Sequence, residues 1–445
     1  MELQGKCITV VGYGKTGKAC VEVLSKLGAR LKVTDKKKDI QISSDIEAEI
    51  GGHTFEFISD SDLVVVSPGV RWDEPILDFA RKKGIETISE IELASRLIDR
   101  PIIAITGTNG KTTTTALTAH ILSKSGRNVS LVGNIGTPFI QEVLKGHPDY
   151  FVLEVSSFQL QGTATFKPWI GALLNIAMDH LNWHNNFEEY IEAKKRLFIN
   201  QSKNDFLIFN YDDENVRTVV SSAKSNKIMF SFCKKDGVYL DDNKIKFNIP
   251  EYSKYEIDLG KVRLIGQHNF SNIMVAMTIG LICKLLPEEI EFALEDFTPY
   301  PHTLEKFLEF NGITFIDDSK ATNPHATISA LKSLSESKIL IIGGQDKGMD
   351  FEPLIEEIEK NNIRHICLIG KTKEKIKGLL ERRRIFNFSS CNTLEDVVET
   401  GMRYAKKGDI ILFSPACASF DMFNNYKERG EKFKEIVYKW KCNKD

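Results

Sequence analysis

The strongest chemical signal in the sequence is the glycine-rich segment TGTNGKT at residues 106–112. It lies between an apolar run, PIIAIT, and a segment with helical periodicity. Backbone N–H groups at the start of a helix, together with the helix dipole, favour bound phosphate. Lys111 could reach the outer phosphates of a nucleotide, and the Thr112 hydroxyl could bind Mg²⁺. The usual phosphate loop has glycine where this chain has Ile105. The segment is therefore a shortened variant, and with Lys-Thr in place it predicts phosphate binding rather than a plain glycine turn.

A second glycine motif, GYGKTG at residues 12–17, follows a strand-like run near the start of the chain. Asp35 stands at the end of the next strand-like run, where a ribose-binding acid would lie. This pattern is typical of a nicotinamide dinucleotide site. The same glycines could instead bind another nucleotide diphosphate, or only let a helix pack on a strand. The motif alone does not choose among the three.

Further reactive side chains follow apolar runs that read as buried strands. Glu154 ends the run YFVLE, and His180 follows WIGALLNIAMD. The carboxyl ends of neighbouring parallel strands meet at one sheet edge, so Glu154, His180 and Thr112 could share a crevice with a metal-bound nucleotide. Lys320 and Lys347 each follow a later strand and could hold anionic substrates.

The elements that must position these residues form three α/β blocks. In each block short apolar runs alternate with helical segments, which predicts parallel sheets with right-handed crossovers. The first block ends near residue 97, and prolines at 299 and 301 mark a linker before the third. The stretch from about 200 to 262 has the weakest pattern. The sequence thus predicts an α/β protein of three domains, 1–97, 98–298 and 299–445.

Composition excludes several classes of protein. The 445 residues carry a formal net charge of −2, which gives no reason to propose a nucleic-acid or membrane surface. No apolar run approaches the roughly 18 residues of a membrane span, and the first residues lack a secretory pattern. The eight cysteines are scattered without a Cys-x-x-Cys, which favours free thiols in a reducing cytoplasm. We therefore expect a cytoplasmic protein.

Taken together, the motifs resemble the Mur ligase family over nearly the whole chain, least between about 200 and 262. TGTNGKT is that family's ATP signature and is shared with folylpolyglutamate synthases. More discriminating are EVSSFQL at 154–160 and SPACASFDMFNNYKERGEKF at 414–433, which resemble the D-glutamate-adding member. The Asp-Asn-Pro-Arg stretch expected of the diaminopimelate-adding member is absent from the sequence.

The resemblance implies an ATP-dependent ligase that adds D-glutamate to UDP-N-acetylmuramoyl-L-alanine in peptidoglycan synthesis. ATP and Mg²⁺ would convert the alanyl carboxylate to an acyl phosphate, which the D-glutamate amine then attacks. The fold implied is a Rossmann-like N-terminal domain for UDP, a central P-loop ATPase-like domain, and a Rossmann-like, doubly wound C-terminal domain for the amino acid. Small molecules would be the only partners, and the resemblance implies a monomer.

Specific residues follow from the same resemblance. Those matching ATP-site positions are Gly107, Thr108, Asn109, Gly110, Lys111, Thr112, Thr113, Asn269, Asn272 and Asp318. Those matching the UDP-substrate site are Gly14, Lys15, Thr16, Asp35, Lys36, Ser67, Asn134, Ser156 and Gln159. Those matching the D-glutamate site are Lys320, Thr322, Lys347, Ser419 and Tyr426. The implied catalytic residues are Lys111, Glu154, His180 and Lys194. Thr112, Glu154, His180 and Lys194 are the implied metal-site residues, Lys194 because it matches a lysine that is carbamylated in this family. His180 would alternatively orient the incoming amine.

Two positions depart from the family pattern. Thr303 stands where an arginine commonly contacts ATP phosphate, so we expect weaker ATP binding unless a residue such as Lys306 compensates. Tyr426 stands where a phenylalanine can occur and could add a hydrogen bond near D-glutamate.

Three other readings compete with this one. A folylpolyglutamate-type amide ligase would share the ATP site, but the N-terminal UDP-type block argues against it. A nicotinamide-dependent oxidoreductase would use the first glycine motif and leave Lys111, Glu154 and the third block without a role. A non-catalytic nucleotide-binding protein is the remaining alternative.

Overall fold

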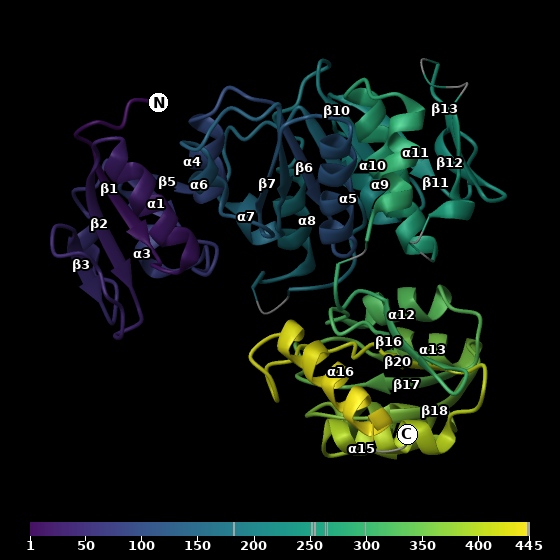
Figure 1. The fold of residues 1–445 in the computed structure, drawn as a ribbon. Coiled ribbons are helices and arrows are strands. Elements are labelled where there is room, and N and C mark those ends of the chain that lie inside the picture. Colours follow the sequence, from purple (N-terminus) through teal and green to yellow (C-terminus); the bar gives the residue numbers. More distant parts are fainter. Residues whose placement is uncertain are drawn as a thin grey trace. The chain divides into compact units, whose positions relative to one another are not determined.

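The computed structural model describes residues 1–180, 183–250, 252, 255–262, 264, 266–298 and 300–442. Pro299, where the predicted linker begins, and residues 443–445 at the predicted end of the third domain lie outside the described residues. The chain forms two compact units (Figure 1). The first comprises Met1–Ile176, Trp183–Lys261 and Ser271–Asp296, and the second comprises Ala177–Asn182, Val262–Phe270 and Phe297–Asp445.

The first unit begins with a five-stranded parallel sheet in the order β3-β2-β1-β4-β5. Its strands are β1 (Cys7–Val11), β2 (Arg30–Asp35), β3 (Glu47–Ile50), β4 (Leu63–Val66) and β5 (Glu86–Ser89). Its helices are α1 (Lys15–Lys26), α2 (Phe55–Ile58), α3 (Pro75–Lys82) and α4 (Glu90–Arg96). Every residue of β1 and β4 is buried, as expected of central strands covered on both faces.

The same unit contains a nine-stranded sheet in the order β14-β13-β12-β11-β10-β9-β6-β8-β7. Its strands are β6 (Ile102–Thr106), β7 (Val129–Gly133), β8 (Tyr150–Glu154), β9 (Ile170–Leu173), β10 (Phe206–Asn210), β11 (Asn226–Ser231), β12 (Gly237–Asp241), β13 (Lys244–Asn248) and β14 (Glu256–Asp258). Its helices are α5 (Lys111–Lys124), α6 (Phe139–Glu142), α7 (Ser157–Gln161), α8 (Phe187–Lys195), α9 (Glu214–Val220), the 3₁₀ helix η1 (Leu259–Lys261), α10 (Gln267–Ile282, in this unit from Ser271) and α11 (Pro287–Asp296). The stretch with the weakest sequence pattern supplies β10–β14, of which β12, β13 and β14 pair antiparallel.

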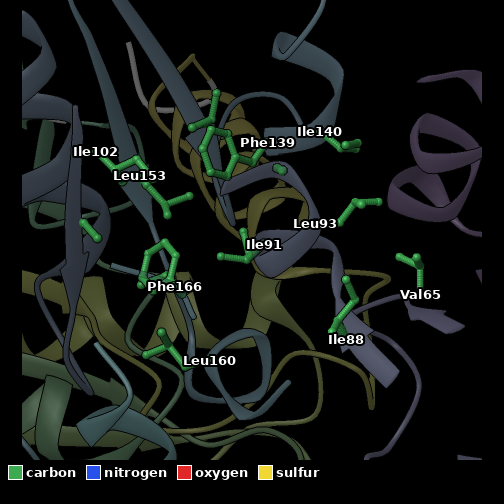
Figure 2. Close-up of a cluster of buried hydrophobic side chains, with 14 of the residues drawn as sticks. Val65, Ile88, Ile91, Leu93, Ile102, Phe139, Ile140, Leu153, Leu160 and Phe166 are labelled. Atoms are coloured by element: carbon green, nitrogen blue, oxygen red, sulfur yellow. The ribbon is translucent and has the colours of Figure 1, made fainter. Parts of the chain in front are cut away.

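One hydrophobic cluster runs from the first sheet to the second (Figure 2). Val65 and Ile88 come from the five-stranded sheet, and Leu153 comes from the nine-stranded sheet. Leu93 on α4 and Ile140 on α6 lie in the same cluster between them. Burying each such side chain contributes about 1.5–3 kcal/mol. Helices α4 and α6 are therefore among the elements that stabilise the core shared by the two sheets.

The second unit contains a six-stranded sheet in the order β15-β16-β20-β17-β18-β19, parallel except for the β15–β16 pair. Its strands are β15 (Glu305–Phe310), β16 (Ile313–Asp317), β17 (Lys338–Ile342), β18 (Ile363–Leu368), β19 (Phe388–Ser390) and β20 (Ile410–Phe413). Its helices are α12 (Pro324–Lys332), α13 (Glu352–Lys360), α14 (Lys373–Arg382), α15 (Leu394–Tyr404) and α16 (Tyr426–Cys442). Leu340 and Leu412 belong to a core cluster on one face, whereas Ile341 and Phe413 belong to a cluster on the other. This alternation is that of a sheet covered by helices on both faces, as predicted.

No helix within the described ranges is long and apolar enough to cross a membrane.

Candidate active site

The phosphate-loop segment connects β6 to α5, as its sequence predicts. Gly110 is the N-cap residue of α5 and has φ 84°, a left-handed conformation that favours glycine. A Cβ at this position would lie 2.6 Å from Oδ1 of Asn272. That amide oxygen also accepts a hydrogen bond from the Thr114 hydroxyl at 2.9 Å, so Asn272, predicted to lie in the ATP site, packs against the loop.

Two residues that were not predicted from the sequence, Asn175 and Tyr190, hold the phosphate loop by hydrogen bonds. Asn175 accepts a hydrogen bond from the Asn109 N–H at 2.8 Å and donates one to the Asn109 carbonyl at 3.1 Å. The Tyr190 and Thr108 hydroxyls lie 2.8 Å apart. Asn175 lies two residues after β9, so a polar residue following a buried strand was the signal that could have revealed it.

The first turn of α5 is arranged to receive an anion. It contains no acidic residue, and the side chains of Thr112 and Thr113 are buried in it. The Lys111 amine donates to the carbonyls of Gly107 at 2.9 Å and Thr108 at 2.8 Å, so it lies over the loop. Backbone N–H groups at a helix start and an adjacent ammonium together favour a phosphate chain.

Glu154 ends β8, which pairs in parallel with β6 so that Glu154 is opposite Ile105, just before the loop. Its side chain is 1% exposed. Oε1 accepts a hydrogen bond from the Asn134 amide at 2.7 Å, which brings together two predicted site residues. Oε2 is buried and has no hydrogen-bond partner among the described residues. A buried carboxylate oxygen without a donor is costly unless a cation or proton joins it, so this oxygen is a candidate metal ligand.

Lys194, on α8, is also 1% exposed and lies directly beneath the phosphate loop. Its amine donates to the Gly107 carbonyl at 2.9 Å and lies 3.4 Å from the Thr106 hydroxyl. It is 4.7 Å from the centre of the Tyr190 ring. Lys194 and Lys111 therefore both donate to the Gly107 carbonyl, and their catalytic roles stay a prediction.

Ser156 and Gln159 form the capping box at the start of α7. The Ser156 N–H and hydroxyl both donate to Gln159 Oε1, at 3.0 and 2.7 Å. Both were predicted to lie at the UDP-substrate site, and the cap holds them together two and five residues beyond Glu154.

The first glycine motif connects β1 to α1, and Gly14 is the N-cap residue. A Cβ on Gly17 would lie 2.0 Å from the Gly12 carbonyl, so the last glycine lets helix and strand approach closely. Asp35 accepts hydrogen bonds from the N–H groups of Tyr13 at 2.7 Å and Lys37 at 2.8 Å. The acid thus braces the loop directly.

The other predicted UDP-site residues surround this loop. Lys15 and Thr16 form the first turn of α1, and the Lys15 amine donates to the Gly136 carbonyl at 3.1 Å. The Ser67 hydroxyl donates to the Gly12 carbonyl at 2.6 Å. Lys36 forms an ion pair of 2.6 Å with Glu74, which a diphosphate would have to displace.

The remaining predicted residues lie in the second unit, so the proposed meeting of His180 with Thr112 and Glu154 stays a prediction. His180 has φ 55°, and its N–H donates to Asp179 Oδ1 at 2.8 Å. The other Asp179 oxygen accepts from the Asn323 amide at 3.1 Å. His180 is therefore held in an uncommon backbone conformation by a buried acid.

Asp318 and Asn269 are both buried. Asp318 accepts a hydrogen bond from the Ser414 hydroxyl at 2.7 Å and one from the Leu304 N–H at 3.2 Å. Burial raises the pKa of Asp318 to about 7, against the opposing effect of these hydrogen bonds. Asn269 lies in the first turn of α10, and its N–H donates to the Gly266 carbonyl at 2.9 Å.

The residues predicted for D-glutamate follow β16, β17 and β20, whose carboxyl ends lie at one edge of the third sheet. They are Lys320, Thr322, Lys347, Ser419 and Tyr426. Tyr426 is the first residue of α16. The sequence analysis missed Arg429, whose buried guanidinium donates to the Ser319 carbonyl at 2.7 Å and the Cys417 carbonyl at 3.0 Å. Arg429 thus ties together the loops that carry Lys320 and Ser419.

The departure at Thr303 has a structural counterpart. Its hydroxyl oxygen is buried and has no hydrogen-bond partner among the residues described. Lys306, suggested as a substitute cation, forms an ion pair of 2.7 Å with Glu309 on the same strand. For Lys306 to replace the missing arginine at the ATP phosphates, its ion pair with Glu309 would have to break. This replacement stays a prediction.

A second group of possible metal ligands is already neutralised. His302, Glu305 and Asp317 have ligand atoms within 4.8 Å of one another. The Lys434 amine lies 2.6 Å from Glu305 and 3.8 Å from Asp317. An internal cation therefore accounts for this cluster.

The fold and the phosphate loop define a nucleotide-dependent α/β enzyme, and comparisons with known proteins identify its family. Residues 6–89 match the MurD-like N-terminal domain of Mur ligases, residues 105–280 the Mur ligase middle domain, and residues 304–417 the glutamate ligase domain of Mur ligases. The chain therefore belongs to the Mur ligase family.

Two curated relatives align over nearly the whole chain and share a name. The UDP-N-acetylmuramoylalanine–D-glutamate ligase of Alkaliphilus metalliredigens is 40% identical, over 98% of this chain and 99% of its own. The ligase of the same name from Caldicellulosiruptor bescii is 41% identical, over 98% of each chain.

Solved structures share the fold. UDP-N-acetylmuramate–alanine ligase from Thermotoga maritima aligns with a TM-score of 0.60 at 18% identity, over 98% of this chain and 99% of that one. The MurF ligase of the same organism in complex with ADP aligns with a TM-score of 0.61 at 17% identity, over 98% and 95%. The predicted three-part α/β fold is thereby confirmed.

Proposed function

We propose that this chain is an ATP-dependent ligase that joins D-glutamate to UDP-N-acetylmuramoyl-L-alanine during peptidoglycan precursor synthesis. The observation that carries the proposal is full-length similarity of about 40% identity to D-glutamate ligases, in a chain that retains an intact phosphate loop. A MurD-like N-terminal domain favours this reading over a folylpolyglutamate-type ligase or a nicotinamide oxidoreductase.

ATP would lie on the loop at residues 106–112 with its phosphates at the start of α5. The Lys111 amine would leave the Gly107 and Thr108 carbonyls for the β- and γ-phosphates, because its reach from the first turn of the helix allows both positions. Such fixed donors act chiefly by stabilising the charge that develops on the transferred group.

The donor set beside the loop fits Mg²⁺. Glu154 offers a buried oxygen that has no donor among the described residues, and Thr112 offers a hydroxyl in the first turn of α5. Oxygen ligands of this kind suit a hard divalent cation, which would neutralise phosphate charge when bound. Carbamylation of Lys194 would add anionic oxygens near the Thr106 hydroxyl, where they could accept a hydrogen bond.

The reaction would proceed in two steps. An oxygen of the alanyl carboxylate attacks the γ-phosphorus of ATP, and ADP leaves, giving an acyl phosphate. The D-glutamate amine then attacks the acyl carbon, loses a proton, and expels inorganic phosphate as the amide forms. His180 would orient that amine. The two carboxylates of D-glutamate would be held by Lys320, Thr322, Lys347, Ser419 and Tyr426.

The UDP portion would lie at the first glycine loop. The N–H groups at the start of α1 and the Lys15 and Lys36 ammonium groups suit a diphosphate. Ser67 and Asp35 would remain structural braces of this loop while lying next to the ligand. We further propose that the enzyme acts in the cytoplasm as a monomer.

The test is release of phosphate from ATP in the presence of Mg²⁺ and UDP-N-acetylmuramoyl-L-alanine. D-glutamate, L-glutamate, L-lysine and meso-diaminopimelate are compared as acceptors. Release that depends on D-glutamate supports the proposal, and release with another acceptor, or none with any, contradicts it. The Lys111→Ala variant serves as the background control.

A further inference from the structure

Glu90, the first residue of α4, is a buried acid to which neither the sequence motifs nor the proposed mechanism assigns a role. It is 1% exposed, and Oε1 accepts a hydrogen bond of 2.7 Å from the Ile140 N–H. Its charge also interacts with the Phe139 N–H. These are the first two N–H groups of α6, so the carboxylate of one domain caps a helix of the next.

No lysine, arginine or histidine within the described residues forms an ion pair with Glu90. A carboxylate buried without a counter-ion is unfavourable, and burial raises its pKa to about 7 despite the two N–H donors. The titratable group facing it from α1 is Cys20, whose own pKa is raised by burial and by Glu90, so the thiol stays neutral. A neutral residue could accept the same hydrogen bond without this penalty. Unfavourable buried charges of this kind concentrate at functional positions.

What Glu90 holds in place is the segment between β7 and α6. Within it the Asn134 amide donates to Glu154 Oε1 at 2.7 Å, and the Asn134 N–H donates to the Glu154 carbonyl at 2.9 Å. The Gly136 carbonyl accepts from the Lys15 amine at 3.1 Å. This segment, residues 133–138, therefore joins the predicted UDP site to the predicted metal site, and its far end is fixed by Glu90.

The packing around α6 supports this role. Both α1 and α4 contact α6, and Leu93 on α4 lies beside Ile140 in the shared core (Figure 2). Phe139 and Ile140 are fully buried in this core and hold α6 against α1 and α4, but apolar contacts satisfy none of the N–H groups at its start. The charge-assisted hydrogen bonds from these N–H groups to Glu90 tie down the start of α6, and with it the segment that precedes the helix.

We infer that Glu90 is a positioning residue that holds segment 133–138 in the orientation that binds the UDP-linked substrate. The inference rests on the proposed function for its substrate. Its structural part, the control of α6 and segment 133–138 by Glu90, does not.

The experiment compares Glu90→Gln with Glu92→Gln in the full chain. Glu92 is a matched control because it is also a buried carboxylate on α4 that accepts hydrogen bonds from backbone N–H groups in the part of the first unit that contains the nine-stranded sheet. Its partners are the N–H groups of Ala164, Thr165 and Phe166, the Thr165 hydroxyl and the Arg96 guanidinium, none of which belongs to α6 or segment 133–138. Both variants remove a buried charge at the same domain junction, but only the first loosens α6.

We expect Glu90→Gln to raise the KM for the UDP-linked substrate about fivefold at pH 8, where the wild-type carboxylate is ionised, with little change in the KM for ATP. At pH 6 the wild-type group is largely protonated, and the ratio of variant to wild-type KM should approach one. For Glu92→Gln this ratio should not change between the two pH values. A Glu90→Gln ratio near one at pH 8, or the same pH dependence in Glu92→Gln, overturns the inference.

Hydrogen exchange separates this inference from the proposed function. At pH 8 the Phe139 and Ile140 amides should exchange faster in Glu90→Gln than in wild type and unchanged in Glu92→Gln. If the wild-type protein shows no ligase activity but this exchange pattern appears, the substrate assignment fails and the structural part stands. Unchanged exchange in Glu90→Gln refutes the structural part, whatever the activity.

Discussion

Burial of Glu90 predicts how the stability of the first unit depends on pH. Its pKa rises from an ordinary 4.5 to about 7 on folding. The folded state therefore binds the proton more tightly, so stability is greatest below pH 4.5 and is lost as pH rises to 7. At 1.36 kcal/mol per pKa unit the loss totals about 3 kcal/mol, of which about 2.5 kcal/mol falls between pH 5 and 8.

Glu90→Gln removes this titration. Urea unfolding of wild type and variant at pH 5, 6, 7 and 8 should give a free-energy difference that moves by about 2.5 kcal/mol in favour of the variant across the series. The glutamine amide can also change the free energy of unfolding by an amount that does not depend on pH. The test therefore uses only the change of the free-energy difference with pH.

Glu92→Gln again supplies the control, with the opposite sign. Burial pushes the pKa of Glu92 upward, but hydrogen bonds from Thr165, Ala164 and Arg96 outweigh it, and the net shift is downward. Its contribution is present above its unfolded pKa and is lost only in acid, so the difference between wild type and Glu92→Gln should be flat from pH 5 to 8. A flat difference for Glu90→Gln as well would refute the reasoning, because it would mean that Glu90 ionises as freely in the folded protein as in the unfolded chain.

Three further predictions concern the nucleotide site. Gly110→Ala should destabilise the protein by about 1–2 kcal/mol and raise the KM for ATP, because φ is 84° and the new Cβ would lie 2.6 Å from Asn272; wild-type values in both assays would contradict this. Glu154→Gln should raise the Mg²⁺ concentration for half-maximal activity at least tenfold, since it replaces a candidate anionic ligand with a neutral one; an unchanged Mg²⁺ titration would remove Glu154 from the metal site. Thr303→Arg should lower the KM for ATP about tenfold by restoring a charged phosphate contact, whereas no change would mean that another cation already serves there. Lys111→Ala, which lacks the amine at the phosphates, gives the background rate in each activity assay.

The central strands and the two glycine loops could be predicted from sequence because their signals are local. Continuous apolar runs such as those of β1, β6 and β17 are buried on both faces and read as parallel strands wherever they stand. The loops at Gly12 and Gly110 are recognisable because a positive φ and a close backbone approach each require glycine.

The edge strands and the supporting residues could not be found this way. β3 and β14 are edge strands, and β13 and β12 come next after β14 in the sheet order; all four are short, most of their residues are exposed or half exposed, and only pairing with a neighbouring strand makes them strands. Arg429 binds the carbonyl of Cys417, 12 positions away, and Glu90 binds the N–H of Ile140, 50 positions away. No spacing rule in the sequence connects such partners.

The most direct test of the proposed acyl-phosphate mechanism traces the oxygen atoms of the substrate carboxylate into the products. UDP-N-acetylmuramoyl-L-alanine carrying ¹⁸O in its terminal carboxylate is incubated with ATP, Mg²⁺, D-glutamate and the enzyme, and both products are analysed by mass spectrometry. Activation through an acyl phosphate predicts one labelled oxygen in the released phosphate and one retained in the new amide. Amide formation with unlabelled phosphate would contradict the mechanism, and phosphate release without an amide to D-glutamate would contradict the function itself.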